Sequence, residues 1–193
     1  MKKNVFIAGV PRAGKSTLAS RLAKTTGWQH LPVDMIVAGF ERAFPETEID
    51  TNAEKPEMEK YRTISRKLAP FLRGMTDGDE FEKYDHGVIF DVYQLTPEDY
   101  VKHVQSENTA VVFLGTADLT AEERFQLLKR YDTPAEYTYF YPDEENRQNC
   151  ADIVEVSRYI RAECARLGLP YYDTAEDRDR VLDEIMQKMI SEL

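Results

Sequence analysis

A single motif near the N-terminus narrows the possible folds more than any other part of the sequence. Residues 9–17 read GVPRAGKST and match the pattern G-x-x-x-x-G-K-S/T. The apolar run at residues 4–8 is typical of a buried strand. Residues 15–26 carry apolar side chains at i, i+1, i+4 and i+5, which predicts a helix that ends at Gly27. A strand, a glycine loop and a helix in this order are the setting in which the motif binds phosphate.

The chemistry of this loop predicts a nucleoside triphosphate site. Gly9 and Gly14 let the backbone bend so that its N–H groups point at one phosphate, at the positive end of the helix. Lys15 can reach the β- and γ-phosphates, and the Ser16 hydroxyl can ligate Mg²⁺. The alternative is an ordinary strand-to-helix turn. We expect ATP with Mg²⁺ to contact these loop residues: Gly9, Pro11, Arg12, Ala13, Gly14, Lys15, Ser16 and Thr17.

Composition and charge narrow the class of protein further. A chain of 193 residues is long enough for one domain with one large core. The formal net charge of −10 argues against a nucleic-acid partner, because backbone phosphates require a basic surface. The sequence contains no apolar run of 18 residues, so it predicts no membrane-spanning helix. We expect a small-molecule substrate, no nucleic acid, no membrane, and a monomer or a homodimer.

The two cysteines and the start of the sequence favour a cytoplasmic protein. The chain passes from Met-Lys-Lys directly into a six-residue strand, which is too short for a signal peptide. Cys150 and Cys164 fall in or next to a predicted helix and lack the spacing of metal ligands. We therefore interpret both as reduced packing residues.

Short apolar runs alternate with helical segments, a pattern typical of a parallel sheet with helices on both faces. The predicted strands are 4–8, 29–33, 87–92, 109–114 and 169–173. Two long segments interrupt the alternation. Long excursions from strand ends tend to bind ligands or act as lids. We therefore predict a single domain, 1–193, with a substrate-binding insertion at about 35–86 and a lid at about 115–150.

Acidic residues follow two of the predicted strands. Asp34 comes after the strand at 29–33, and Asp91 closes the apolar run that begins at Val88. Ligands of open α/β sheets bind beyond the carboxyl ends of the strands. Two acids and a phosphate loop at one edge of a sheet are the minimum set of groups that phosphoryl transfer requires.

These residues resemble those of the small P-loop kinases related to adenylate, shikimate and gluconate kinases and to chloramphenicol phosphotransferase. The resemblance rests on the loop motif, the acid Asp34, the run 88–91 followed by Leu-Thr-Pro-Glu at 95–98, and the segment 167–174. The last segment looks like the fifth strand and its adenine-side loop, so Thr174 is expected to contact the nucleotide. The resemblance implies a three-layer α/β P-loop NTPase fold with a five-stranded parallel sheet in the order 2-3-1-4-5.

The resemblance also implies roles for individual side chains. Asp91 resembles the acid that holds Mg²⁺ together with Ser16, the alternative being a turn residue at the strand end. Asp34 resembles the acid that accepts a proton from the substrate hydroxyl, the alternative being a helix N-cap. Arg124 and Arg130 lie in the predicted lid, where an arginine can neutralise charge on the transferring phosphate. They are six residues apart, about 240° around a helix, so only one is expected to reach the phosphates, and a solvated surface position is the alternative for each.

The acceptor side is less defined by the sequence. Arg62, Arg66 and Arg73 lie along one side of a predicted helix. They form either an anion clamp or a charged outer face balanced by Glu57 and Glu59, and we favour the outer face. The segment Asp-Gly-Phe-Pro-Arg of true adenylate kinases does not occur at residues 91–93.

These observations predict an ATP-dependent kinase that transfers the γ-phosphate to a small-molecule acceptor, at a hydroxyl group. Two alternatives stay open. One is a nucleoside monophosphate kinase with a degenerate acceptor motif. The other is a non-catalytic nucleotide-binding regulatory protein. The guanine-reading segment Asn-Lys-x-Asp of GTP switches does not occur in the sequence.

Overall fold

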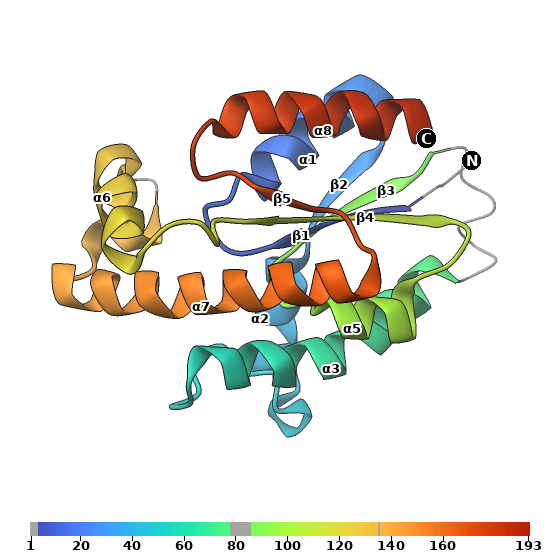
Figure 1. The fold of residues 1–193 in the computed structure, drawn as a ribbon. Coiled ribbons are helices and arrows are strands. Elements are labelled where there is room, and N and C mark those ends of the chain that lie inside the picture. The colour runs from blue at the N-terminus through green and yellow to red at the C-terminus, as the bar shows by residue number, and fades with distance from the viewer. Residues whose placement is uncertain (1–3, 78–85, 135) are drawn as a thin grey trace.

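A five-stranded parallel sheet lies between two layers of helices in the computed structural model, which describes residues 4–77, 86–134 and 136–193 (Figure 1). The strand order β2-β3-β1-β4-β5 confirms the order that the resemblance implied. All four strand pairs are parallel. The strands are β1 (Asn4–Gly9), β2 (Gln29–Pro32), β3 (Val88–Val92), β4 (Thr109–Gly115) and β5 (Tyr171–Asp173).

Helices cover both faces of this sheet. In Figure 1, α1 and α8 lie on one side, and α3, α5 and α7 lie on the other. The α-helices are α1 (Lys15–Thr26), α2 (Val33–Ala43), α3 (Glu57–Thr76), α5 (Pro97–Asp99), α6 (Ala121–Tyr131), α7 (Asp143–Leu167) and α8 (Arg178–Glu192). Short 3-10 turns occur at η1 (Pro45–Thr47) and η3 (Tyr137–Phe140), and η2 (Tyr100–Val104) is a π-helical turn. This arrangement is the predicted three-layer α/β fold.

The central strands are buried on both faces, which explains their continuous apolar runs. Every residue of β1 and of β3 is buried. Phe6 and Phe90 are partners in the register of these strands, and their rings stack with centroids 4.5 Å apart. Tyr100 of η2 packs edge-on against Phe6. The buried centre holds the carboxyl ends of β1 and β3 side by side, where the phosphate loop begins.

The start of α2 differs from the sequence prediction. The strand predicted at 29–33 ends at Pro32, and the helix begins at once with Val33. Asp34 therefore lies in the first turn of α2, not at the end of a strand, and the N-cap position belongs to Pro32. An acid in a first turn is favoured by the positive end of the helix, which accounts for its place there.

The two long segments between strands are largely helical. The segment 35–86 contains most of α2, together with η1 and α3, and its residues 78–85 lie outside the described part of the chain. The segment 115–150 contains α6, η3 and the start of α7. Within the described ranges, none of the helices combines the length and the apolar character that a bilayer crossing requires.

Candidate active site

Two glycines shape the phosphate loop between β1 and α1. Gly9 has φ 122° and Gly14 has φ 96°, both in the left-handed region that favours glycine. A Cβ at Gly9 would overlap the carbonyl oxygen of Leu114 in β4. The N–H of Val10 donates to this same oxygen at 3.0 Å. The start of the loop therefore packs closely against β4. Gly14 is the N-cap residue of α1.

Lys15 lies at the centre of the site and is only 8% exposed. Its Nζ donates to the carbonyl oxygen of Val10 at 3.0 Å, so the side chain folds back over the loop. Burial lowers the pKa of Lys15, whereas the nearby carboxylates of Asp91 and Asp34 raise it and Arg124 lowers it slightly. The next residue, Ser16, is exposed at the start of α1, where its hydroxyl can reach a ligand.

Asp91 is in β3, one residue before the end of the strand, and is 7% exposed. Its partners in the sheet are Ile7 of β1 and Pro32 of β2. His30 of β2 approaches it, with 3.6 Å between its Nε2 and the Asp91 Oδ2. Sequence reasoning missed His30, because only the parallel pairing of β2 with β3 brings it next to the acid.

Asp34 reaches the same region from the first turn of α2. Its side chain is exposed at the surface, yet the protein around it removes enough water to raise the pKa of its carboxyl group. The charge of Asp91 raises this pKa further, and Lys15 opposes both effects. The fold thus brings together one lysine and two acids that the sequence predicted as site residues.

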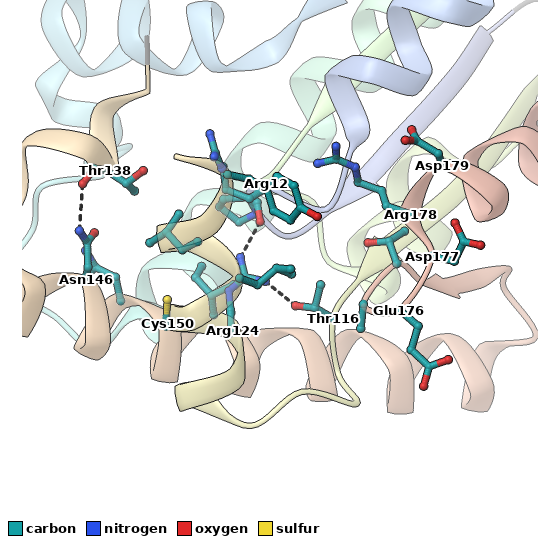
Figure 2. A pocket seen from close by; sticks show the side chains of 18 residues that line it. Arg12, Thr116, Arg124, Thr138, Asn146, Cys150, Glu176, Asp177, Arg178 and Asp179 are labelled. Carbon is teal, nitrogen blue, oxygen red and sulfur yellow. Dashed lines mark hydrogen bonds between the residues drawn. The ribbon is translucent and has the colours of Figure 1, made fainter. Parts of the chain in front are cut away.

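Arg124 fastens the phosphate loop to the first half of α6. It is 7% exposed, and its Nη2 donates to the carbonyl oxygen of Pro11 at 2.7 Å. Its Nη1 donates to the hydroxyl oxygen of Thr116, just beyond β4 (Figure 2). This arginine therefore lies beside the phosphate loop.

Arg12 connects the same loop to the segment between α6 and η3. It is in the left-handed region with φ 64°, which is uncommon for a residue with a side chain. Its guanidinium pairs with Asp132, 3.5 Å away, and with Glu136. Asp132 also accepts a hydrogen bond of 2.8 Å from the Thr138 hydroxyl. Sequence reasoning predicted that Arg12 contacts ATP, and did not find these acidic partners.

Two further arginines of the segment 115–150 are exposed. Arg130 is exposed on α6 and does not line the cavity described below. Arg147 pairs with Glu122, and its guanidinium lies 3.9 Å from the centroid of the Phe125 ring. The 240° separation of Arg124 and Arg130 explains why only one of them faces the loop.

A cavity of about 270 Å³ opens between the phosphate loop, α6, α7 and the start of α8 (Figure 2). Each of α6 and α7 contributes side chains at i, i+3, i+4 and i+7, which form one face of a helix. These side chains are Arg124, Leu127, Leu128 and Tyr131 of α6, and Asn146, Asn149, Cys150 and Ile153 of α7. The remaining wall consists of Pro11, Arg12, Thr116, Thr138 and residues 174–179.

Thr174 and Cys150, which both line this cavity, carried different predictions from the sequence. Thr174 was predicted to contact nucleotide, and it lines the cavity while its hydroxyl donates to the Gly115 carbonyl oxygen at 3.2 Å. Cys150 was predicted to be a packing residue, and it is buried with a free thiol. Burial raises the pKa of this thiol, which keeps it protonated.

Tyr93 forms the wall on the other side of Lys15. The lysine Nζ lies 5.9 Å from the centroid of its ring. The Tyr93 hydroxyl donates to Glu57 Oε1 at 2.7 Å, at the start of α3, and its ring stacks on Tyr61. Glu57 also pairs with Lys60 at 2.9 Å. This wall therefore joins β3 to α3 next to the phosphate loop.

The arginines of α3 do not have the acidic partners that the sequence suggested. Glu57 pairs with Lys60, and Glu59 pairs with Lys55. Arg62 instead lies 4.5 Å from the centroid of the Tyr159 ring in α7, and Arg73 pairs with Asp77 at 2.6 Å. Arg66 is exposed. The arginines thus lie on an outer face of α3. The groups that contact their charges are the Tyr159 ring and Asp77, not Glu57 and Glu59.

The donor set at the loop fits a magnesium ion shared with phosphate. Mg²⁺ is usually bound by one or two protein oxygens, water and substrate phosphates. The exposed Ser16 hydroxyl and the Asp91 carboxylate, which interacts with Lys15 of the loop, match this pattern. Among the described residues, no group of three or more His, Cys, Asp or Glu side chains is placed to hold a metal by itself.

Comparison with known proteins shows similarity in structure but not in sequence. No model of a protein family matches the chain, and no curated protein matches its sequence. Shikimate kinase from Acinetobacter baumannii matches with a TM-score of 0.54 and 19% identity, over 100% of this chain and 95% of that chain. Shikimate kinase from Bacteroides thetaiotaomicron matches with a TM-score of 0.55 and 16% identity, over 98% of both chains. Deoxyadenosine kinase from M. mycoides matches with a TM-score of 0.50 and 15% identity, over 97% of this chain and 99% of that chain. The chain therefore has the fold of the small P-loop kinases.

Proposed function

We propose that this protein is an ATP- and Mg²⁺-dependent kinase that transfers the γ-phosphate to a hydroxyl group of a small molecule. The observation that carries the proposal is the convergence of Lys15, Asp34 and Asp91 at one end of the sheet, beside a phosphate loop. The fold shared with shikimate kinases and a deoxyadenosine kinase supports a phosphotransferase.

The nucleotide would bind along the loop with its base in the cavity between α6 and α7. The cavity begins at Pro11 and Arg12 of the loop, so a triphosphate on the loop leads directly into it. Lys15 would leave the Val10 carbonyl oxygen and bind the β- and γ-phosphates. Ser16 and Asp91 would hold Mg²⁺, which neutralises phosphate charge when it is bound.

Asp34 would act as the base for the acceptor hydroxyl. In the transfer, the acceptor oxygen forms a bond to the γ-phosphorus while the bond to the β–γ bridging oxygen breaks and ADP leaves. The hydroxyl proton passes to the Asp34 carboxylate. A raised pKa suits this role, because it makes the carboxylate a better proton acceptor than an ordinary aspartate near neutral pH.

The segments 35–86 and 115–150 would supply the acceptor wall and the lid. Tyr93 and Glu57 would form one side of the acceptor site, next to Lys15. Arg124 would remain beside the phosphates, while the contact of Arg12 with Asp132 and Glu136 would bring the lid onto the loop. Lid closure excludes water from the reacting phosphate.

Turnover of ATP tests the proposal directly. ADP formation is measured with Mg²⁺, alone and with each member of a panel of hydroxyl-bearing metabolites. We expect one compound or class to stimulate turnover strongly and to carry the transferred phosphate. Binding of ATP with no stimulation by any acceptor would instead support a nucleotide-binding regulatory protein. Stimulation by nucleoside monophosphates alone would support a nucleotide kinase.

A further inference from the structure

The side-chain amide of an asparagine on α7 has its nitrogen hydrogen-bonded and its oxygen unpaired. Asn146 is 1% exposed and lines the cavity. Its Nδ2 donates to the Thr138 carbonyl oxygen at 2.9 Å and to the Tyr141 carbonyl oxygen at 3.4 Å (Figure 2 marks the first). Both acceptors are carbonyl oxygens, so they require the nitrogen on their side and fix the orientation of the amide.

The oxygen of the same amide has no hydrogen-bond partner. Asn146 Oδ1 is buried, and no donor among the described residues reaches it. Buried polar atoms are normally paired, because an unsatisfied acceptor retains the full cost of its lost hydration. Asn146 lines the cavity, so a ligand there that brings an N–H to this buried, unsatisfied oxygen would gain a hydrogen bond that the unliganded protein lacks.

Part of the surrounding wall is apolar and suits the faces of a flat ring. Leu127 and Leu128 of α6 and Ile153 of α7 line the same cavity. Two hydroxyl groups of the cavity have a partner in the protein, because Thr116 accepts from Arg124 and Thr174 donates to the Gly115 carbonyl oxygen. Asn146 Oδ1 is thus a buried acceptor that the protein itself leaves free for a ligand.

We propose that Asn146 is a specificity-determining residue that accepts a hydrogen bond from the exocyclic amino group of adenine. The inference rests on the proposed function, in which the cavity holds the nucleotide base. Adenine presents an N–H donor at the 6-position of its ring, whereas guanine presents an oxygen there. That oxygen would face another acceptor without a proton between them, so adenine is favoured over guanine.

Binding of three triphosphates to the wild-type chain tests the inference without any substitution. ATP, purine riboside triphosphate and GTP are titrated with Mg²⁺ in a calorimeter. We expect ATP to bind about tenfold more tightly than purine riboside triphosphate, which differs only in lacking the amino group. We also expect ATP to bind more tightly than GTP. Equal affinities for ATP and the purine analogue, or tighter binding of GTP, would overturn the inference.

Two variants of α7 assign the effect to one residue. In Asn146→Ala the preference for ATP over the purine analogue should disappear, while Gln148→Ala, at an exposed position of the same helix outside the cavity lining, should keep it. Thermal melting of both variants checks that they fold, because Asn146 also ties η3 to α7. A preference that survives in folded Asn146→Ala would overturn the assignment. If the wild-type chain binds none of the three triphosphates, the proposed function itself fails, and this inference fails with it.

Discussion

The two sides of the phosphate loop are built differently. On the nucleotide side, Arg124 and Arg12 are tied to the loop and to the lid segment, around a cavity with walls from both α6 and α7. On the acceptor side, charged groups of α3 pair mainly with their own surroundings, as Lys60 does with Glu57 and Arg73 with Asp77. Asp34 remains exposed there. Packing therefore shapes the half that we propose to bind nucleotide, whereas a few accessible groups define the half that we propose to bind the acceptor.

Lys15 belongs to both halves, so its loss should have the largest effect. We expect Lys15→Ala to lower ATP turnover by about 10³-fold or more, because the loop amides alone cannot counter the charge that develops on the phosphates. Steady-state ADP formation measures the effect. Lys24→Ala, an exposed lysine of the same helix, is the control and should keep normal turnover. Turnover of Lys15→Ala at the wild-type rate would contradict the phosphate-loop assignment.

Asp34 tests the acceptor half alone. Asp34→Asn should lower kcat by about 10²- to 10⁴-fold, the usual contribution of a positioned base, while ATP affinity changes little. Single-turnover transfer to the identified acceptor and ATP titration measure the two quantities. Asp183→Asn, a surface acid paired with Arg21, serves as the control. Normal transfer by Asp34→Asn would mean that the base lies elsewhere, with Asp91 the next candidate.

The pH dependence of transfer sharpens the same assignment. A base acts in its ionised form, and the pKa of Asp34 is raised above the ordinary value of 3.8. The rate should therefore fall on acidification at a higher pH than for an ordinary aspartate. On the alkaline side, the lowered pKa of Lys15 places the loss of its charge below 10.5. A pH–rate profile measures both limbs, and an acidic limb that persists unchanged in Asp34→Asn would refute the assignment.

Arg124 tests the packing of the nucleotide half. Arg124→Met removes the donor to the Pro11 carbonyl oxygen and to Thr116, and should lower the free energy of unfolding by about 1–3 kcal/mol. Arg130→Met, at an exposed position of the same helix, should change it by less than about 0.5 kcal/mol. Urea denaturation compares the two variants. Equal stability of both would show that the tie between α6 and the loop contributes little.

The smallest expected effect is a change in protection of the lid. Residues 131–145 should exchange amide hydrogens faster than the sheet in the free protein, and should gain protection when ATP and acceptor bind together. Hydrogen exchange followed by mass spectrometry measures this difference. Equal protection in the free and bound states would identify the segment as a fixed wall.

Sequence reasoning succeeded where the signal is local. The apolar runs of β1 and β3 and the glycine pattern of residues 9–17 predict elements from neighbouring residues alone, and the sheet order followed from the resemblance. Asp34 was misplaced by one element, because α2 begins directly after Pro32 with no intervening loop. This junction depends on backbone geometry that residue types indicate only weakly.

The cavity was not predicted, because its walls come from distant parts of the chain. A signal for one wall was present. Ile153 lies on one face of α7, and Asn146, Asn149 and Cys150 continue that face at i−7, i−4 and i−3. Polar residues on a buried stripe could have been recognised as a ligand-facing end. The pairing of Arg12 with Asp132 and Glu136 could not have been recognised, because both acidic residues lie in irregular segments.

The cavity walls come from the first, middle and last parts of the chain, which has a thermodynamic consequence. Residues 11–12 precede α1, residues 116–153 span α6 and the start of α7, and residues 174–179 lead into α8. A binding site built from all three parts exists only in the folded chain, so the ligand binds the folded state and not the unfolded one. By mass action it adds RT ln(1 + [L]/Kd) to the stability of the whole domain, about 2.7 kcal/mol at a hundredfold excess over Kd. The concentration of nucleotide around the protein would then help to determine how much of it stays folded.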